Sequence, residues 1–290
     1  MKLNSFCMTC LVQMQERQIR NFPDEEKKVL YMRKIMGFLA NADENLSAPA
    51  LLEPLAGLYE EYWGVQNHGM EKVKKQFNDL LLSMEDALEQ EIRLSKEPLE
   101  TALCYARIGN YIDFGALQDV SSEILLSMFA QENKKPLDEK EYAYFQKDLE
   151  KAQKLVYLTD NCGEIVLDKI VMKLLKEQYP DLSIEVIVRG AAVSNDAALE
   201  DAEYVGLTDL VSVLGNGSRI AGTELSCISK EARQKIQQAD VIISKGQGNF
   251  ETIHGCGLNI YYLFLCKCDW FMRKFQAKHL EGMFVNERRI

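Results

Sequence analysis

The chain has no long run of apolar residues, and no apolar segment follows its first lysine. No stretch approaches the ~18 consecutive apolar residues that a membrane-spanning helix needs. The N-terminus also lacks the hydrophobic core of a secretory leader. We therefore expect a soluble, cytoplasmic protein that has no membrane partner.

A surplus of basic residues is also missing. The 290 residues include 34 Lys and Arg against 44 Asp and Glu, which gives a formal net charge of −10. This balance argues against a general surface for nucleic acid or for an anionic membrane, because both are bound mainly through positive charge. A local basic pocket for a small anion is still compatible with it.

Cysteine is too sparse for a disulfide scaffold, with eight residues in 290, and thiols in the cytosol stay reduced. Cys7 and Cys10 form a Cys-x-x-Cys pair, and Cys266 and Cys268 form a Cys-x-Cys pair. The two pairs could bind zinc if the fold brought them together. The alternative, in which Cys266 and Cys268 are small core residues, is the better supported of the two.

The chain contains two styles of sequence. Residues 1–151 carry amphipathic helical patterns, the longest of them from Glu71 to Ser95. From residue 152 onward, short apolar stretches typical of strands alternate with helical patterns. Strands separated by helices predict a mostly parallel sheet with right-handed crossovers. We therefore predict an α/β protein with a helical domain over residues 1–151 and a sheet-containing domain over residues 152–290.

The stretch from Leu155 to Ile165 predicts a buried strand that turns into a helix. Its first four residues are apolar, and apolar residues from Ile165 to Leu175 recur at helical spacing. Asp160 and Asn161 fall where the strand ends, and open α/β sheets bind ligands beyond the carboxyl ends of their strands. Either side chain could instead cap the helix, and for this stretch alone both interpretations stay open.

Further polar and glycine-rich clusters follow two later predicted strands. They comprise Arg189, Asn195 and Asp196 after the strand 184–188, and Lys245, Gly246, Gly248, Asn249 and Glu251 after the strand 239–243. Because parallel strands end at the same edge of a sheet, we expect these side chains to converge there. Neighbouring strands lie ~4.8 Å apart, so the loops that follow them can share one small ligand.

The acidic and amide groups of these clusters suit a metal ion. Asp160, Asn161 and Asp196 offer two carboxylates and an amide carbonyl. Oxygen ligands of this kind are preferred by Mg²⁺ or Mn²⁺, which also bind the phosphate oxygens of substrates. Glu164, one helical turn beyond Asp160, could orient a metal-bound water or act as a general base.

The basic and glycine residues suit a phosphate. Lys245 could contribute an ammonium group, and Gly246 and Gly248 could contribute exposed backbone N–H groups. Arg189 is a second candidate for anion binding, with a structural salt bridge as an equal alternative. The Lys245 segment is not a Walker A motif, and the first strand–helix turn lacks the Gly-x-Gly-x-x-Gly fingerprint.

Two other classes of function stay open at this point. The first is a nucleotide-cofactor enzyme such as a methyltransferase, against which the missing glycine fingerprint counts. The second is a non-catalytic interaction or metal-storage module, for which a polar cluster at a single strand end would be expected.

In the helical half, Gly109 and Gly115 bracket Asn110 and Asp113, and this pattern taken alone predicts a tight turn.

Together the motifs resemble the damage-control phosphatases, a family long labelled domain of unknown function 89. The matching segments are Thr159-Asp160-Asn161-Cys162-Gly163-Glu164, Arg189-Gly190 with Asn195-Asp196-Ala197, Lys245-Gly246-Gln247-Gly248-Asn249-Phe250-Glu251, Gly109-Asn110-Tyr111-Ile112-Asp113, and the Cys7-x-x-Cys10 pair of the prokaryotic-type branch. The resemblance covers nearly the whole chain. It implies a helical domain packed on a Rossmann-like α/β/α domain. It also implies metal-dependent hydrolysis of phosphomonoesters of small metabolites, such as sugar phosphates or damaged phosphometabolites.

By position, the resemblance assigns one divalent metal ion to Asp160, Asn161 and Asp196, and phosphate contact to Lys245. We expect Mg²⁺, Mn²⁺, Co²⁺ or Ni²⁺ as the ion and a small phosphorylated metabolite as the partner. The predicted catalytic residues are Asp160, Glu164, Lys245 and Asp113, and the predicted substrate-binding residues are Asn110, Arg189, Asn195, Gly246, Gly248, Asn249 and Glu251. Direct attack by water is preferred to a phosphorylated Asp160, because that residue is a predicted metal ligand. The oligomeric state is left open.

Overall fold

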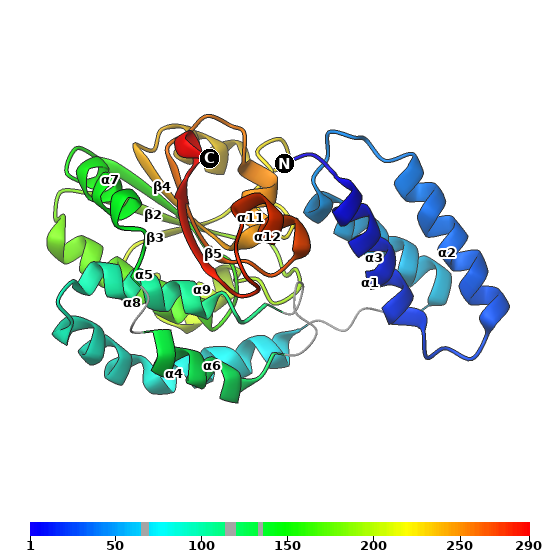
Figure 1. Ribbon diagram of the computed structural model, residues 1–290, viewed down its shortest axis with the longest axis horizontal. Coiled ribbons are helices and arrows are strands. Elements are labelled where there is room, and N and C mark those ends of the chain that lie inside the picture. The colour runs from blue at the N-terminus through cyan, green and yellow to red at the C-terminus, as the bar shows by residue number, and fades with distance from the viewer. Residues whose placement is uncertain (65–69, 114–119, 133–135) are drawn as a thin grey trace. The chain divides into compact units, whose positions relative to one another are not determined.

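The computed structural model describes residues 1–64, 70–113, 120–132 and 136–290 (Figure 1). Phe114 and Gly115, the end of the glycine-bracketed stretch, lie outside the described residues. The chain forms two compact units, residues 1–68 and residues 69–290. Within the described ranges, every helix is too short or too polar to cross a lipid bilayer.

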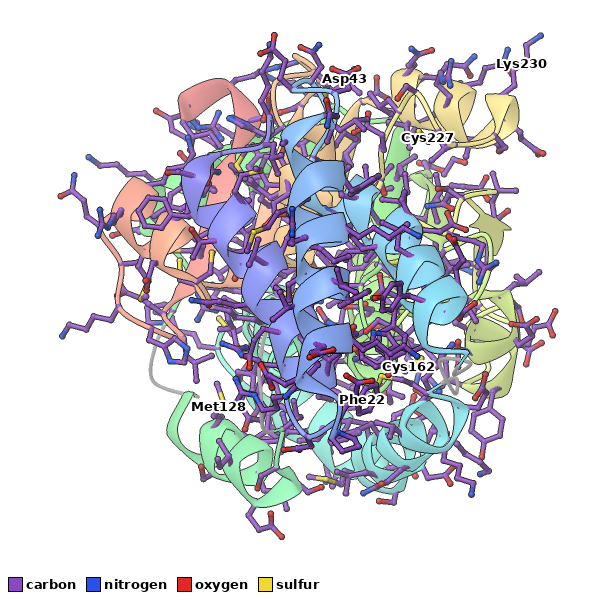
Figure 2. All side chains as sticks on the ribbon, turned by 90° about the vertical axis from the view of Figure 1, so that its right-hand side faces the viewer. Phe22, Asp43, Met128, Cys162, Cys227 and Lys230 are labelled. Carbon is purple, nitrogen blue, oxygen red and sulfur yellow. The ribbon has the colours of Figure 1, made fainter. Side chains whose placement is uncertain are left out.

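The described part of the first unit is a set of three helices that pack against one another, as Figure 2 shows. They are α1 (Ser5–Ile19), α2 (Glu25–Ala40) and α3 (Ala48–Trp63). Asn4 and Asp24 start the first two helices by accepting hydrogen bonds from first-turn N–H groups. Pro49 occupies the first turn of α3, where its missing N–H is harmless. The unit has its own buried core, made of Leu11, Ile19, Tyr31, Ile35, Leu39, Leu51 and Leu55.

The second unit combines helices with one six-stranded sheet. Its helices are α4 (Glu71–Leu94), α5 (Pro98–Gly109), α6 (Ser122–Glu132), α7 (Glu139–Leu149), α8 (Glu164–Gln178), α9 (Leu199–Tyr204), α10 (Lys230–Gln237), α11 (Gly246–Ile253) and α12 (Asp269–Phe275), with a final 3-10 turn η1 (Glu287–Arg289). Its strands are β1 (Lys154–Leu158), β2 (Ser183–Val188), β3 (Ser212–Gly215), β4 (Val241–Lys245), β5 (Ile260–Leu265) and β6 (Gly282–Asn286).

The strand order of the sheet is β3-β2-β1-β4-β5-β6. Strands β1 to β5 are parallel to their neighbours, and β6 pairs with β5 in the antiparallel direction. This is the order of the doubly wound Rossmann sheet, in which the order reverses between the first and fourth strands. The predicted α/β fold with a mostly parallel sheet is confirmed.

Helices cover both faces of this sheet. Alternate residues of β1 point to opposite faces, as a pleated strand requires. Leu155 and Tyr157 join the core that includes α4, α5 and α8, whereas Val156 and Leu158 join the core that includes α10, α11 and α12. The unit is therefore an α/β/α sandwich. The loops that follow the parallel strands lie along the edge of the sheet where these strands end.

The predicted boundary at residues 151/152 marks the start of the strands, but the compact units divide at residues 68/69. The reason is α5, which is buried along nearly its whole length. A helix that is apolar on all sides needs neighbours on all sides. Helix α5 packs on α8 and contacts β5 and β6, so the helices after residue 70 share one core with the sheet.

Several elements differ from the sequence prediction. Strand β4 extends to Lys245, so this lysine ends the strand instead of following it. Strand β5 is the continuous apolar run Ile260–Leu265, which is buried at every position and therefore shows no alternation. The elements α6, β5, α12 and β6 were not anticipated.

Candidate active site

The candidate site lies where the strand order of the sheet reverses. Strand β1 leads through Thr159 to Asp160 and Asn161, and the neighbouring strand β4 ends at Lys245. Helices α8 and α11 begin close to these two strand ends, and α11 has no side chain that caps its first turn. Free N–H groups and the helix dipole make such helix starts favourable for anions.

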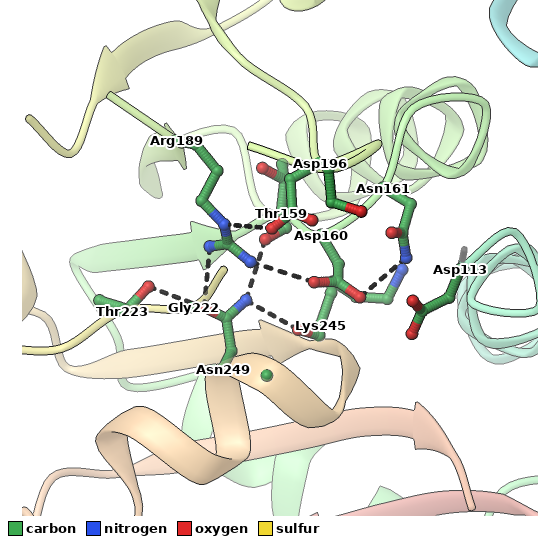
Figure 3. Close-up of polar contacts among 12 residues, drawn as sticks. Asp113, Thr159, Asp160, Asn161, Arg189, Asp196, Gly222, Thr223, Lys245 and Asn249 are labelled. Carbon is green, nitrogen blue, oxygen red and sulfur yellow. Dashed lines mark hydrogen bonds and ion pairs between the residues drawn. The ribbon is translucent and has the colours of Figure 1, made fainter. Parts of the chain in front are cut away.

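Asp160 is buried, and three donors hold its carboxylate in one orientation (Figure 3). Oδ2 accepts hydrogen bonds from Nδ2 of Asn110 at 2.9 Å and from Nδ2 of Asn161 at 2.8 Å. Oδ1 accepts a hydrogen bond from Nη2 of Arg189 at 3.0 Å. Asn110, predicted to bind substrate, thus donates a hydrogen bond to the proposed metal ligand Asp160.

Arg189 joins the two carboxylates that the sequence predicts as metal ligands. Its Nε donates to Oδ2 of Asp196 at 2.6 Å, while its Nη2 donates to Asp160. The two carboxylates therefore point toward the same place and not to opposite sides of the molecule. Arg189 itself is only 1% exposed, and the ion pairs it forms are buried.

Backbone hydrogen bonds join the two loops that carry these acids. The N–H of Ala197 donates to the carbonyl of Asp160 at 2.8 Å, and the N–H of Cys162 donates to the carbonyl of Asn195 at 2.9 Å. Nδ2 of Asn195 also donates to Oδ1 of Asn161 at 3.0 Å. Cys162, labelled in Figure 2, is buried in this junction. The loops after β1 and β2 are thus joined by hydrogen bonds of both backbone and side chains.

Glu164 orients the amide of Asn161. Its Oε2 accepts hydrogen bonds from Nδ2 of Asn161 at 2.9 Å and from the backbone N–H of Asn161 at 3.3 Å. The second amide hydrogen of Asn161 goes to Asp160. Because both amide hydrogens are directed at carboxylates, the carbonyl Oδ1 of Asn161 must point the other way, toward Asn195.

Lys245 is held inside the core of the unit. Its side chain has no solvent exposure, and its ammonium donates to Oε1 of Glu164 at 2.5 Å, to Oδ1 of Asp168 at 2.7 Å and to the carbonyl of Ala106 at 3.0 Å. Burial alone would lower the pKa of Lys245, but Asp168 and Glu164 outweigh it and hold that pKa above its ordinary value. The phosphate contact predicted for Lys245 would require one of these hydrogen bonds to break.

Asn249, predicted to bind substrate, is fully occupied by the protein. Its Nδ2 donates to the carbonyls of Thr159 at 2.9 Å and Lys245 at 2.7 Å. Its Oδ1 accepts from Nη1 of Arg189 at 3.0 Å and from Oγ1 of Thr223 at 2.7 Å (Figure 3). With every donor and acceptor used, Asn249 positions Arg189 between the two acids.

Asp113 and Lys267 form an ion pair at the same site. In the view of Figure 3 the Asp113 carboxylate lies on the side of Asp160 away from Arg189. Nζ of Lys267 donates to Oδ2 of Asp113 at 2.6 Å. Lys267 was missed by the sequence prediction, although it follows β5 at the same edge as the other clusters. Recognition of Ile260–Leu265 as a strand would have revealed it.

Gly246, Gly248 and Glu251 occupy three different environments on α11. Gly246 has φ +76°, and a Cβ atom there would lie 2.0 Å from Oδ2 of Asp160. A Cβ atom at Gly248 would lie 2.4 Å from the carbonyl oxygen of Ala221, so this glycine allows a close contact between loops. Glu251 lies further along α11 and is half-buried.

The buried network holds more acids than bases. Its acids are Asp113, Asp160, Glu164, Asp168 and Asp196, and its bases are Arg189, Lys245 and Lys267. Burial, followed by repulsion from Asp196 and Glu164, raises the pKa of Asp160 well above its ordinary value, and burial likewise raises the pKa of Asp196. With all of these described groups ionised, five acids against three bases would leave a formal surplus of two negative charges, which one divalent cation would balance.

The donor atoms present fit a hard divalent cation. Asp160 and Asp196 offer carboxylate oxygens, and Asn161 offers its oriented Oδ1, a set that Mg²⁺ and related ions prefer. In the part of the chain that the structure describes, no three His, Cys, Asp or Glu side chains form a ready-made metal cluster. All eight cysteines are free, and the pairs at Cys7 and Cys266 belong to different units, so the zinc interpretation stays a prediction.

Comparison with known proteins finds relatives over nearly the full length of the chain. The family model for the damage-control phosphatase ARMT1-like domain matches residues 4–281. The chain is 28% identical over 287 residues to a damage-control phosphatase of Pyrococcus horikoshii, covering 96% of this chain and 95% of that protein. It is also 28% identical over 279 residues to a damage-control phosphatase of Archaeoglobus fulgidus, covering 93% of each. The crystal structure of a DUF89 family protein from Pyrococcus horikoshii is similar with a TM-score of 0.79 and 26% identity, over 99% of both chains.

Proposed function

The chain belongs to the ARMT1-like damage-control phosphatases and is a phosphatase, and from this premise we propose that it hydrolyses phosphomonoesters of small metabolites with one divalent metal ion. The family implies a divalent cation in general. The ion that we propose is Mg²⁺, Mn²⁺, Co²⁺ or Ni²⁺, and the proposed substrates are sugar phosphates or damaged phosphometabolites.

Asp160, Asn161 and Asp196 would hold the ion. This assignment is supported by the meeting of both carboxylates at Arg189 and by the orientation that Glu164 imposes on the Asn161 amide. When bound, a divalent ion neutralises charge on the phosphate oxygens and lowers the pKa of a coordinated water. Phosphoryl transfer depends on positioning and charge neutralisation more than on covalent chemistry, which suits a rigid site of this kind.

The hydrogen bonds of Asp160 favour attack by water over a phosphorylated aspartate. A nucleophilic carboxylate needs an oxygen that is free to approach phosphorus. Both oxygens of Asp160 accept hydrogen bonds, from Asn110, Asn161 and Arg189, and these bonds fix the carboxylate and reduce its nucleophilicity. We therefore propose that Asp160 serves as a ligand and that water is the nucleophile.

The start of α11 would receive the phosphate. The N–H groups of its first turn, from Gly246 to Asn249, are not capped by a side chain. The helix starts beside Asp160, because Gly246 lies against the carboxylate of that residue. Lys267, paired with Asp113, would supply an ammonium group that is not committed to the α8 acids. Arg189 would hold the two ligand carboxylates in place, with Asn249 behind it.

The nucleotide-cofactor alternative gains no support from the site. The strand order is that of dinucleotide-binding folds, in which a pyrophosphate lies against the first helix of the sheet. In this chain the turn before α8 carries the Asp160 carboxylate and the buried Glu164 instead of a glycine-rich loop. Two acids at that position would repel a pyrophosphate.

The observation that carries the proposal is the convergence of Asp160 and Asp196 on one guanidinium at the switch point of the sheet. The test is release of inorganic phosphate from a panel of phosphorylated metabolites. The protein is first stripped with a chelator and then assayed with each of Mg²⁺, Mn²⁺, Co²⁺ and Ni²⁺. We expect hydrolysis only when a divalent ion is restored.

Isosteric variants test the ligand assignment. Asp160→Asn and Asp196→Asn should lose about 10²-fold or more in kcat while keeping the far-ultraviolet circular dichroism of the parent. Asp240→Asn is the matched control, because Oδ2 of Asp240 accepts backbone hydrogen bonds from Gln153 and Lys154 at the opposite end of β1. Full metal-dependent activity in either site variant would refute the proposed metal ligands.

A further inference from the structure

Helix α4 is bonded directly to the turn that carries the proposed metal ligands. Oδ1 of Asn78 accepts a hydrogen bond from the backbone N–H of Gly163 at 2.6 Å, and Asn78 is only 1% exposed. Gly163 follows Asn161 by two residues and is the N-cap residue of α8, where it has no side chain to accept a hydrogen bond from the first turn. Asn78 therefore provides the acceptor for an N–H group at the start of this helix.

The turn rests on α4 with almost no space between them. Gly163 has φ +78°, and a Cβ atom there would lie 2.9 Å from Cδ1 of Ile112 and 3.0 Å from Cβ of Phe77. The carbonyl oxygen of Phe77 would be 3.2 Å away. Glycine is required at this position both by its backbone conformation and by the close approach of α4.

The same face of α4 holds the segment that follows the second acidic ligand. Nζ of Lys74 lies 2.6 Å from Oδ2 of Asp201, and Nδ2 of Asn78 donates to Oδ1 of Asp201 at 3.4 Å. Oδ2 of Asp201 also accepts the N–H of Ala198 at 2.9 Å, two residues beyond Asp196. Asn78 thus contacts the loop after β1 directly, and it reaches the segment that follows Asp196 through Asp201 of α9.

We propose that Asn78 is a positioning residue of this site, supported by Lys74. The inference rests on the proposed function and adds a residue from a helix far away in the sequence. Asn78 acts through Gly163 on the turn of Asp160 and Asn161, and through Asp201 on the segment after Asp196. It sets the separation of the two loops and therefore the fit of the ligands to one ion.

The test is calorimetric titration of the full-length, chelator-stripped protein with Mn²⁺. Asn78→Leu removes the acceptor at similar volume, and we expect it to raise the Kd for Mn²⁺ by about 10- to 100-fold, the range found for residues that orient metal ligands. Asn78→Asp keeps an acceptor for Gly163 but loses the donor to Asp201, so its Kd for Mn²⁺ should lie between those of the parent and of Asn78→Leu. This partial rescue by the isosteric variant distinguishes positioning from a general loss of packing.

Asn259→Leu is the matched control. Asn259 is also buried and also makes side-chain hydrogen bonds, to Asp148 at 3.0 Å and to the carbonyl of Asp240 at 3.1 Å, but at the opposite end of the sheet. It should lose stability without any change in the Kd for Mn²⁺. If Asn78→Leu does not fold, Asn78→Ala, which leaves room for a water, is judged by the same criterion.

Asp160→Asn in the same titration separates the two proposals. If Asp160→Asn loses Mn²⁺ binding while Asn78→Leu or Asn78→Ala keeps the affinity of the parent, the role of Asn78 is refuted and the proposed metal site stands. If Asp160→Asn binds Mn²⁺ as the parent does, the proposed metal site is refuted, and the role of Asn78 with it. A raised Kd in the Asn78 variant, together with partial rescue by Asn78→Asp, supports the inference.

Discussion

Gly246 lies directly against the carboxylate of Asp160, and a Cβ atom at position 246 would be 2.0 Å from Oδ2. The register of the sheet causes this closeness. Leu158 of β1 lies opposite Ser244 of β4, and Asp160 and Gly246 each come two residues after this pair. The chain leaves β4 with φ +76° at Gly246, a conformation that glycine adopts without strain.

Gly246→Ala should therefore abolish phosphatase activity, because the added methyl group must displace the Asp160 carboxylate from its three donors. Gly257→Ala is the matched control: its φ is +78°, but a Cβ atom there meets nothing within 4 Å. Gly257→Ala should lose about 1 to 2 kcal/mol of stability through backbone strain. Gly246→Ala should lose more, because it also breaks the hydrogen bonds of a buried carboxylate. Only Gly246→Ala should lose activity, measured as phosphate release at saturating metal. Equal activity in the two variants would contradict the assigned role of Asp160.

Lys245→Met should cost about 3 to 5 kcal/mol of unfolding free energy, because it leaves the buried acids Glu164 and Asp168 without their cation. The measurement is chemical denaturation at pH 7. Lys235→Met removes an ion pair with Glu185 that is 47% exposed on the lysine side, and it should cost less than about 1 kcal/mol. A Lys245→Met protein that is as stable as the parent yet inactive would show that Lys245 acts on the substrate and not on the acids of α8.

Lys267→Met should raise the KM for a phosphorylated substrate by about tenfold, the effect of losing one favourable charge contact of ~1.4 kcal/mol. Because Lys267 and Asp113 are paired, the effects of Lys267→Met and Asp113→Asn on kcat/KM should be non-additive in the double variant. Lys274→Met, an exposed lysine of α12, should leave KM unchanged. Additive effects of the two site substitutions would show that the ion pair has no part in substrate binding.

Glu287 predicts a pH-dependent contribution to stability. Burial opposes its ionisation, but hydrogen bonds from His254, Tyr262 and the backbone of Gly255 outweigh burial and lower its pKa below the ordinary 4.5. A carboxyl group whose pKa is lower in the folded state stabilises the protein above its unfolded pKa, and the effect is lost as the pH falls through the folded pKa.

Glu287→Gln should therefore cost about 1.5 to 3 kcal/mol of unfolding free energy at pH 7, and this difference from the parent should shrink as the pH falls below about 4.5. Unfolding in urea at a series of pH values measures it. Glu203→Gln, at an exposed position of α9, should change stability by less than about 0.5 kcal/mol throughout. A difference that grows toward low pH would mean that the protonated form of Glu287 is the one that stabilises the fold.

Much of the secondary structure was predictable because its signals are local. Asp24 caps α2, and Pro98 lies in the first turn of α5, and both residue types are favoured at helix starts. Strand β5 was missed for a local reason too, since six consecutive apolar residues show neither the period of a strand nor that of a helix. The sequence of β6 does not indicate that this strand is antiparallel, because the direction is defined only relative to the partner strand β5.

The candidate site was also predictable only in part. Asp160, Asn161 and Asp196 were predicted from their places after strands, and the structure brings them together. Lys245 and Asn249 were predicted to face the substrate, but the structure directs them to protein partners. The ammonium of Lys245 donates to the carbonyl of Ala106, which is 139 residues away in the sequence. Sequence spacing does not predict a contact between residues so far apart.

By itself the sequence determined that acids, amides and glycines would collect at one edge of a parallel sheet, since parallel strands must end on the same side. Only the tertiary structure decided which groups those side chains bind. Buried polar groups take whichever partners the packing of helices brings to them. Here Asn110, at the end of α5, donates to Asp160, and Asn78 of α4 accepts the N–H of Gly163. Burial makes each of those hydrogen bonds necessary, and chain packing alone selects the partner.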